Sequence, residues 1–304
     1  MTRRLSKGVA LITALLIMAL VATLAYTLEW NNSLDVRRTV VMLNRDQAVQ
    51  VALGAESWMQ TILLQDVQDS QTDHLGEIWA SDLPGLPIDG GEIFGAIEDL
   101  QGRFNVNNLI DADGEVDPIA VEQFENLLRA LALDEKFAGI AADWIDSNQN
   151  ASFPYGAEDS IYTGMTPPYR APNRRLSSAS ELAAIDGMDK ESLDILLPHV
   201  IALPKRTSIN VNTATGPVLQ SLDKDMTLAD AEGLISERAE TGFSDLGRSF
   251  SQWPDVVNQL EESSEFFHLK VVVRIDTVRI TYFSILQRDP GRVTPILRTI
   301  GTTS

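Results

Sequence analysis

The residues best suited to chemistry lie in one acidic segment, DWIDSNQNASFPYGAEDSIY, which covers residues 143–162. Within it, Asp146, Asn148 and Asn150 have the one-three-five spacing of a calcium loop, in which oxygen ligands on alternate positions converge on one ion. Calcium takes about 6–8 oxygen ligands, so acidic residues on either side can complete the shell. The sequence therefore predicts a structural Ca²⁺ held by oxygens from one set: Asp143, Asp146, Asn148, Asn150, Glu158 and Asp159.

Two alternatives stand beside this metal site. Ala151 occupies the sixth position, where an EF-hand requires glycine, so the segment is not an EF-hand. Asp and Asn also gather in loops because they favour turns, which leaves an ordinary polar loop as the simpler interpretation. A second acidic motif, IDADGEVDP at residues 110–118, has Gly114 at its fourth position and is interrupted by Pro118, a pattern that favours an acidic turn.

Catalytic chemistry has little support in the sequence. His74, His199 and His268 are isolated, and the motifs G-x-S-x-G, H-E-x-x-H and the phosphate loop are absent from the printed sequence. Pairs of carboxylates suited to glycosidase chemistry are expected by chance among 43 acidic residues. The sequence therefore favours a protein that is not an enzyme.

The charge and composition restrict the classes of partner that the protein can bind. The net charge is −19, which repels phosphate backbones and makes nucleic acid an unlikely ligand, whereas it suits cations. There is no cysteine, so disulfides and cysteine-ligated zinc are excluded. The 304 residues are enough for one large or two ordinary domains with a substantial apolar core.

The elements that position these residues begin with an uncharged apolar run from Val9 to Leu28. Its 20 residues match the roughly 30 Å hydrocarbon core of a bilayer. Arg3, Arg4 and Lys7 precede it, so the N-terminus is expected in the cytoplasm, with the body of the chain across the membrane. A signal peptide cleaved near residues 22–25 and a plain anchor remain alternatives.

The apolar run continues into an amphipathic stretch, which predicts one helix over residues 9–67. Small or apolar residues recur with helical steps at Val41, Ala48, Val51, Ala55, Trp58 and Ile62. The intervening polar residues, Glu56 among them, are assigned to the opposite face. The alanines suggest that a sheet approaches this helix closely.

Strand-like segments flank a long helical region. In FFHLKVVVRI, Phe267, Leu269, Val271 and Val273 alternate with polar residues, and GRFNVNN is expected to be a strand leading out of the sheet. The expected fold is α+β: the long helix on a small antiparallel sheet (residues 68–107 and 265–304), with a large inserted α-helical domain. That domain is divided into a first helical module at 108–205 and a helical-hairpin module at 206–264.

The leader at residues 1–8, ending in Gly8 before the apolar helix, resembles that of type IV pilins and pseudopilins. By resemblance, a prepilin peptidase cuts between Gly8 and Val9 and methylates the new N-terminus. Most relatives carry glutamate as the fifth mature residue, where this chain has Thr13. In the family that glutamate pairs with the N-terminal amine of a neighbouring subunit, and a subunit with no neighbour above it can be spared the pairing. Within the family, the absence of this carboxylate is typical of minor pseudopilin K of type II secretion systems.

The motifs RFNVNNL, ADWIDSN…GAEDSIY and INVNTAT extend this resemblance over nearly the whole chain. It implies an inner-membrane, single-pass protein with a periplasmic body, at the tip of the pseudopilus, where it initiates assembly and caps the filament for protein export. The implied partners are the minor pseudopilins I, J and H, the major pseudopilin and prepilin peptidase. Calcium binding in the α-domain is also implied.

One competing function comes from the segment INVNTATGPVLQSL…GLISERAETGF, which resembles the helix-hairpin-helix repeats of DNA-uptake proteins. Such hairpins bind phosphate through backbone N–H groups in a glycine-rich turn. The corresponding turn here is DKDM (residues 223–226), acidic and without glycine. A membrane-anchored DNA-binding protein is therefore the alternative, and packing or interaction the preferred role of this unit.

Overall fold

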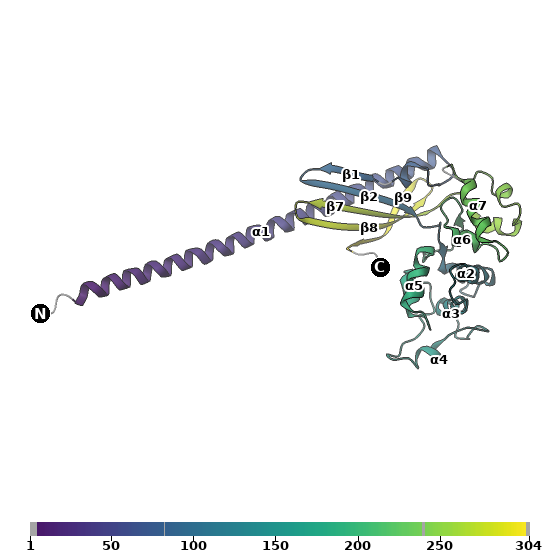
Figure 1. The fold of residues 1–304 in the computed structure, drawn as a ribbon, viewed down its shortest axis with the longest axis horizontal. Coiled ribbons are helices and arrows are strands. Elements are labelled where there is room, and N and C mark those ends of the chain that lie inside the picture. The colour runs from purple at the N-terminus through teal and green to yellow at the C-terminus, as the bar shows by residue number, and fades with distance from the viewer. Residues whose placement is uncertain (1–4, 82, 239–240, 302–304) are drawn as a thin grey trace.

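A computed structural model describes residues 5–81, 83–238 and 241–301. Figure 1 shows a single long helix, α1 (Leu5–Asp69), whose first half projects away from the rest of the chain and whose second half lies against a sheet. The helix is 65 residues long, so it includes the end of the expected leader. Residues 1–4 of that leader lie outside the described residues.

The second half of α1 contacts the sheet through small and apolar side chains. The apolar residues it buries are Ala48, Ala52, Ala55, Met59 and Leu63. Three alanines along this face let the helix axis come close to the strands. The stripe predicted from the sequence is confirmed in part: Ala48 and Ala55 are buried and Val51 and Ile62 pack against the same core, whereas Val41 and Trp58 are 47% and 46% exposed. The face that contacts the sheet is therefore turned slightly from the predicted stripe, towards Ala52, Met59 and Leu63.

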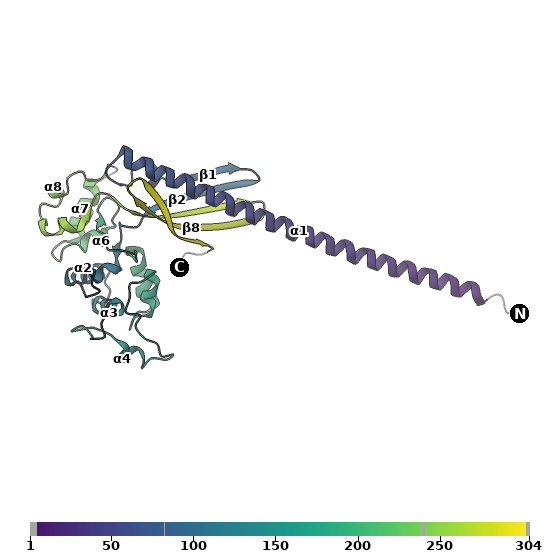
Figure 2. The same cartoon turned by 180° about the vertical axis from the view of Figure 1, so that it is seen from behind.

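The sheet is antiparallel throughout, as expected from the sequence, with strand order β1-β2-β7-β8-β9. Its strands are β1 (Leu83–Ile88), β2 (Gly91–Asp99), β7 (Phe266–Ile275), β8 (Val278–Asp289) and β9 (Arg292–Ile300). Strand β7 buries Phe267, Leu269, Val271 and Val273, the predicted apolar set. Figure 2 shows from behind how α1 crosses this sheet.

The α-domain is inserted between the neighbouring strands β2 and β7, so the chain leaves the sheet after Asp99 and returns at Phe266. It therefore leaves before residue 107, where the sequence set the division. The segment GRFNVNN does not extend the sheet. Its strand β3 (Phe104–Asn105) instead pairs in parallel with β4 (Val200–Ile201) inside the α-domain.

The α-domain contains two helical units, each closed by a two-residue parallel pair. The first runs from β3 to β4 through α2 (Pro118–Ala130), α3 (Lys136–Ile145), α4 (Asp159–Tyr162) and α5 (Lys190–Leu196). The second runs from β5 (Ile209–Asn210) to β6 (Leu260–Glu261) through α6 (Gly216–Gln220), α7 (Leu228–Arg238) and α8 (Leu246–Ser249). Short 3₁₀ turns complete the chain: η1 (Ile78–Ala80), η2 (Val106–Leu109), η3 (Ala179–Ala184), η4 (Leu197–His199) and η5 (Pro254–Gln259).

Both units open with the same tripeptide, Asn-Val-Asn, and use it in the same way. The first asparagine side chain accepts a hydrogen bond from the backbone N–H two residues on, from Asn107 to Asn105 at 3.2 Å and from Asn212 to Asn210 at 3.0 Å. The next asparagine then binds backbone of a distant loop, as Asn212 does by accepting from Phe243 N at 2.6 Å. The two Asn-Val-Asn motifs are thus backbone clamps, which hold the start of each unit to a distant loop.

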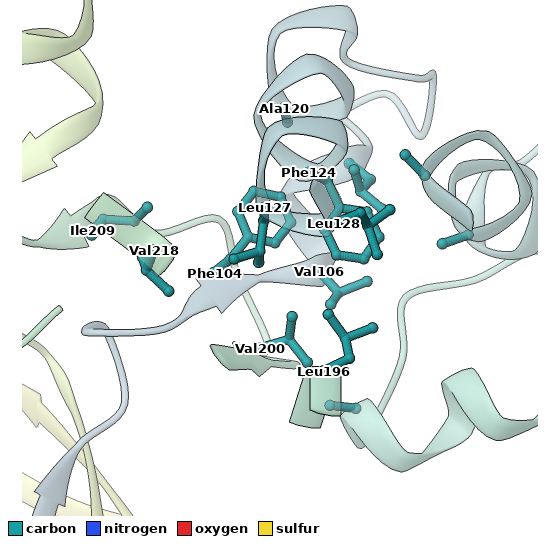
Figure 3. Packing of buried hydrophobic residues seen from close by; sticks show 14 of the residues in the cluster. Phe104, Val106, Ala120, Phe124, Leu127, Leu128, Leu196, Val200, Ile209 and Val218 are labelled. Atoms are coloured by element: carbon teal, nitrogen blue, oxygen red, sulfur yellow. The ribbon is translucent and has the colours of Figure 1, made fainter. Parts of the chain in front are cut away.

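The core of the α-domain forms around α2 and α3. Pro118 occupies the first turn of α2, and Asp117 caps it by accepting from the N–H groups of Ile119 and Ala120. The helix then buries Phe124, whose ring stacks on Phe104 with centroids 5.1 Å apart. In Figure 3 the side chains of Leu127, Leu128, Val200 and Val218 gather around these rings, so both helical units share one core.

Candidate functional site

Three carboxylates of the predicted metal set lie buried at the end of α3. Asp143 is in its last turn, Asp146 is its C-cap, and Glu158 is the N-cap of α4. Their exposed fractions are 0%, 0% and 3%. The apolar side chains of α3 bury the helix in the domain core, and this burial carries its acidic end inward as well.

The hydrogen bonds of these carboxylates leave several oxygens without a donor. Asp143 Oδ2 accepts from Ser152 N at 2.9 Å, and Asp146 accepts from Asn148 N at 3.2 Å and from Asn148 Nδ2 at 2.8 Å. Asp143 Oδ1 and both oxygens of Glu158 are buried and accept no hydrogen bond within the part of the chain that the structure describes. A buried acceptor without a donor is costly, so the site is incomplete by itself.

The charge of these groups is likewise uncompensated. No basic side chain among the described residues forms an ion pair with Asp143, Asp146 or Glu158. Burial and then repulsion from Asp146 and Asp143 raise the pKa of Glu158 to about 7. Burial and then repulsion from Asp143 raise the pKa of Asp146 to about 6. Buried carboxylates of this kind need either protons or a cation.

The other three predicted ligands, Asn148, Asn150 and Asp159, have hydrogen-bond partners of their own. Asn148 is beside Asp146, and its Oδ1 accepts from the exposed Asn150 N at 2.7 Å. Asp159 faces another segment, since its Oδ1 accepts from Ala171 N at 3.1 Å and its Oδ2 lies 3.3 Å from Arg170 Nη1. The donor set at the centre is therefore three carboxylates, hard oxygen ligands that fit Ca²⁺.

The structure adds one acidic residue that the sequence interpretation assigned elsewhere. The predicted turn at residues 111–117 forms around Asp111, which accepts from Asp113 N at 2.8 Å and from Glu115 N at 3.0 Å. This turn lies beside the metal segment, because Ser147 N donates to Gly114 O at 3.0 Å. Glu115 consequently raises the pKa of Asp146 by repulsion, after burial and Asp143. The alternating acidic residues of the motif at residues 110–118 were the sequence signal that could have indicated this contribution of Glu115.

A second acidic cluster was not predicted. Asp66, at the end of α1, lies with Asp73 and Glu77, and one carboxylate oxygen of each is within 4.8 Å of the other two. Among the described residues this is the one set of three carboxylates as close as that. The oxygens of Asp143, Asp146 and Glu158 are less tightly gathered, so a cation there would have to draw them together.

Glu56 corrects the predicted polar face of α1. It is 2% exposed and accepts from Tyr282 Oη at 2.5 Å and from Arg298 Nη2 at 2.6 Å. Burial opposes its ionisation, but the hydrogen bonds from Arg298 and Tyr282 outweigh it and hold the pKa of Glu56 below its ordinary value. Glu56 thus ties α1 to β8 and β9.

The N-terminal half of α1 carries the predicted processing and assembly residues. Val9 is exposed, as are the apolar residues that follow it, and Gly8 belongs to the helical backbone. Thr13 Oγ1 donates to Ala10 O at 3.0 Å, so its hydroxyl is satisfied within the helix and carries no charge that needs a partner. Within the described chain, α1 is the one helix long and apolar enough to cross a membrane.

The three histidines have separate surroundings. The His74 ring lies 3.5 Å from Glu77, His199 forms a 2.8 Å hydrogen bond with Thr215, and His268 stacks on Phe283. None of these pairs adjoins the buried carboxylates at the end of α3. The structure therefore does not bring the histidines together in one site.

The acidic turn of the second unit is closed by its own residues. Asp223 accepts from Asp225 N at 2.8 Å through its side chain and from Met226 N at 3.1 Å through its backbone oxygen. These N–H groups are the donors that a phosphate would require. The turn is therefore acidic and has two of its donors already bonded, which does not favour the DNA-binding alternative.

Comparison with known proteins connects this architecture to a family. Two family models, both described as type II secretion system protein K, match residues 102–205 and 209–255. The chain is 34% identical to type II secretion system protein K of Pseudomonas aeruginosa, over 98% of this chain and 94% of that protein. It is 33% identical to the protein K of Pectobacterium carotovorum subsp. carotovorum, over 98% of both chains.

A solved structure agrees with these sequence relationships. A chain of the crystal structure of the GspK–GspI–GspJ complex from the type 2 secretion system of enterotoxigenic Escherichia coli has a TM-score of 0.77 to this chain. The identity is 26%, and the match covers 88% of this chain and 100% of that one. The long helix, the antiparallel sheet and the inserted helical units, together with these relatives, show that the chain belongs to the protein K family of type II secretion systems, a family of minor pseudopilins.

Proposed function

We propose that this protein is the tip subunit of the type II secretion pseudopilus, where it initiates assembly and caps the filament during protein export. Its role is to provide shape and contacts, with no reaction on a substrate. It is held in the inner membrane by the first half of α1, with the basic N-terminus in the cytoplasm and the body in the periplasm.

The observation that carries this proposal is the position of the α-domain. It lies at the end of the molecule away from the free half of α1, beyond the sheet and to one side of it (Figures 1 and 2). In a filament whose subunits stack along their N-terminal helices, a body of this size blocks the place of the next subunit above. Subunits below meet only α1 and the sheet.

Thr13 supports the same position in the filament. A carboxylate within a membrane-spanning helix is costly unless it is paired. The Thr13 hydroxyl donates to Ala10 O and is neutral, so this helix carries no charge at that position that a neighbouring amine would have to neutralise. A subunit with no neighbour above it can do without the charge.

The partners and the metal follow from the same assignment. We propose that the free half of α1 packs with the helices of the minor pseudopilins I, J and H, and that the major pseudopilin continues below them. The solved relative, which is in a complex with GspI and GspJ, supports this partner class. We also propose that Ca²⁺ binds between Asp143, Asp146 and Glu158, where it would neutralise the buried carboxylates and hold α3 to α4.

The N-terminus of the mature protein tests the assignment first. After coexpression with a prepilin peptidase, mass spectrometry should find a chain that begins at Val9 and carries a methyl group on its amine. The variant Gly8→Val should retain Met1, since it alters the residue before the cut. A wild-type chain that keeps Met1, or one cut near Ala25, would contradict the proposal.

The variant Thr13→Glu tests the position in the filament. It restores the carboxylate of shaft subunits, so the protein should enter the shaft or disturb initiation, and pseudopilus length and secretion should both change. Thr13→Ser is the matched control, because it keeps a neutral hydroxyl able to bond Ala10 O. If Thr13→Glu left length and secretion at the level of Thr13→Ser, the argument from the missing charge would be wrong.

A further inference from the structure

A second group of carboxylates joins the end of α1 to both the sheet and the α-domain. Asp66 lies in the last turns of α1, and Asp73 and Glu77 lie in the loop that follows it. One oxygen from each carboxylate lies within 4.8 Å of the other two. This spacing is close enough for a single ion to contact all three after small side-chain adjustments.

Two oxygens of this group remain without a donor although they are buried. Asp73 is 1% exposed; its Oδ2 accepts from Ser264 N at 2.7 Å and from Arg288, but its Oδ1 accepts from no described residue. Glu77 Oε2 accepts from Trp79 Nε1 at 2.6 Å, and Glu77 Oε1 accepts no hydrogen bond from the part of the chain that the structure describes. The nearest basic group to Oε1 is the His74 ring, at 3.5 Å.

The charges in this cluster do not balance. Among the described residues, Arg288 is the one arginine that pairs with it: Nη1 lies 3.2 Å from Asp66, and Nη2 bonds both Asp73 and, at 2.7 Å, Ser264 O. Three carboxylates and one guanidinium leave two negative charges, which equals the charge that a divalent cation supplies. Consistent with that excess, burial and then repulsion from Glu77 and from Asp73 raise the pKa of Asp66 to about 7.

The neighbouring Asp99 is satisfied in a different way. Its carboxylate accepts from Ser264 Oγ at 2.7 Å, from Asn210 Nδ2 at 2.9 Å and from Gln101 N at 2.8 Å. A buried carboxylate in this region can therefore be provided with donors by the chain. The contrast singles out Asp73 Oδ1 and Glu77 Oε1 as acceptors that the chain leaves for something else.

We propose that a hard divalent cation, Ca²⁺ or Mg²⁺, binds between Asp66, Asp73 and Glu77. Carboxylate oxygens are preferred ligands of both ions, and water molecules complete the coordination shell. Mg²⁺ in particular keeps several of its waters when it binds to protein. Asp66 and Glu77 are slightly exposed, so water can reach the open side. This site is separate from the one proposed at the end of α3, on different residues and in the other half of the body.

The consequence of binding is a tie between three parts of the protein. Asp73 already bonds the second helical unit, since its N–H donates to Glu262 O at 2.8 Å and its carbonyl accepts from Asn210 Nδ2 at 3.0 Å. A cation that adds Asp66 and Glu77 to Asp73 would fix the end of α1 to this contact. The angle between the pilin body and the α-domain would then depend on the bound ion.

The site is tested on the full chain in detergent micelles, in a background that lacks the other candidate site. In Asp146→Asn/Glu158→Gln protein treated with chelator, calorimetric titration with CaCl₂ and with MgCl₂ should still detect one bound ion per chain. Adding Asp66→Asn and Glu77→Gln should weaken that binding by at least about tenfold. Asp69→Asn is the matched control, an exposed carboxylate at the same helix end, and should leave the binding unchanged.

A spectroscopic readout separates lost binding from lost folding. Trp79 donates to Glu77, so its indole should sensitise the luminescence of a Tb³⁺ ion bound there, and Trp79→Phe should abolish the signal while the calorimetric binding persists. Far-ultraviolet circular dichroism should show that Asp66→Asn/Glu77→Gln protein is folded. The proposal is overturned if the background protein binds neither ion at millimolar concentration, or if its binding survives Asp66→Asn/Glu77→Gln. If the background protein bound neither ion, protons would be the groups that neutralise the cluster.

Discussion

Replacing Glu158 by glutamine should make the protein more stable than the wild type without calcium and less stable than the wild type with it. In the calcium-free state the pKa of Glu158 is raised from 4.5 to about 7, first by burial and then by repulsion from Asp146. The native state then binds more protons than the unfolded state between these two values, so stability falls as the pH rises through this window and is constant above it. Since one pH unit corresponds to about 1.4 kcal/mol, ionised Glu158 costs roughly 3–4 kcal/mol above pH 7.

The glutamine variant avoids this cost because it carries no charge. At about pH 7.5 with chelator, Glu158→Gln should unfold roughly 6–16 °C above the wild type, if each kcal/mol moves the midpoint by roughly 2–4 °C. With calcium the order should invert. Wild type gains about 4.1 kcal/mol when the ion is at a thousand times its dissociation constant, which exceeds the cost of ionised Glu158, whereas the variant, which lacks a ligand, gains little.

The assay is thermal unfolding of the full chain in detergent, followed by circular dichroism with chelator and with added CaCl₂. Glu191→Gln, an exposed residue on α5, is the matched control and should follow the wild type in both conditions. The reasoning is refuted if Glu158→Gln is the less stable protein in chelator, or if it responds to calcium as strongly as the wild type does.

Two further substitutions test contacts that hold the fold together. Glu56→Gln should destabilise the protein by roughly 2–3 kcal/mol in thermal unfolding at neutral pH, below the usual cost of breaking a buried pair because Arg298 is half exposed. The loss should shrink at acid pH, since the pKa of Glu56 is held low, and a change under about 0.5 kcal/mol would contradict the burial of this pair. Asn107→Ala should cost roughly 2–4 kcal/mol in chemical denaturation, because it leaves the backbone of Leu176 and the carbonyl of Leu203 without partners at 2.8 and 2.9 Å. Asn108→Ala, whose bonds are only part-buried, should cost clearly less; equal losses would refute the clamp.

The parts of the fold that could be predicted are those with a local repeat. Strand β7 has apolar residues at every second position from Phe267 to Ile275, and α1 combines an uncharged run with a helical stripe, so each signal is complete within its own segment. The acidic segment at 143–159 stands out for the same reason. The sequence does not indicate which oxygens of this segment converge, because Asp146 and Glu158 come together only when α3 is buried in the domain core.

The parts that could not be predicted depend on distant partners. Glu56 is polar and was assigned to the outer face, yet its partners lie 226 and 242 residues away on β8 and β9. Asp66 similarly meets Arg288, which is 222 residues later. Strand β3 has only two residues, too few for an alternation to indicate whether it continues the sheet or pairs with β4.

The central claim is that this subunit occupies the tip of the pseudopilus, and its position can be seen directly. Pseudopili sheared from cells that carry an epitope in the loop at residues 153–155 should be labelled by immunogold and viewed by electron microscopy. The account predicts one cluster of gold at a single end of each filament. Gold distributed along the shaft would contradict it.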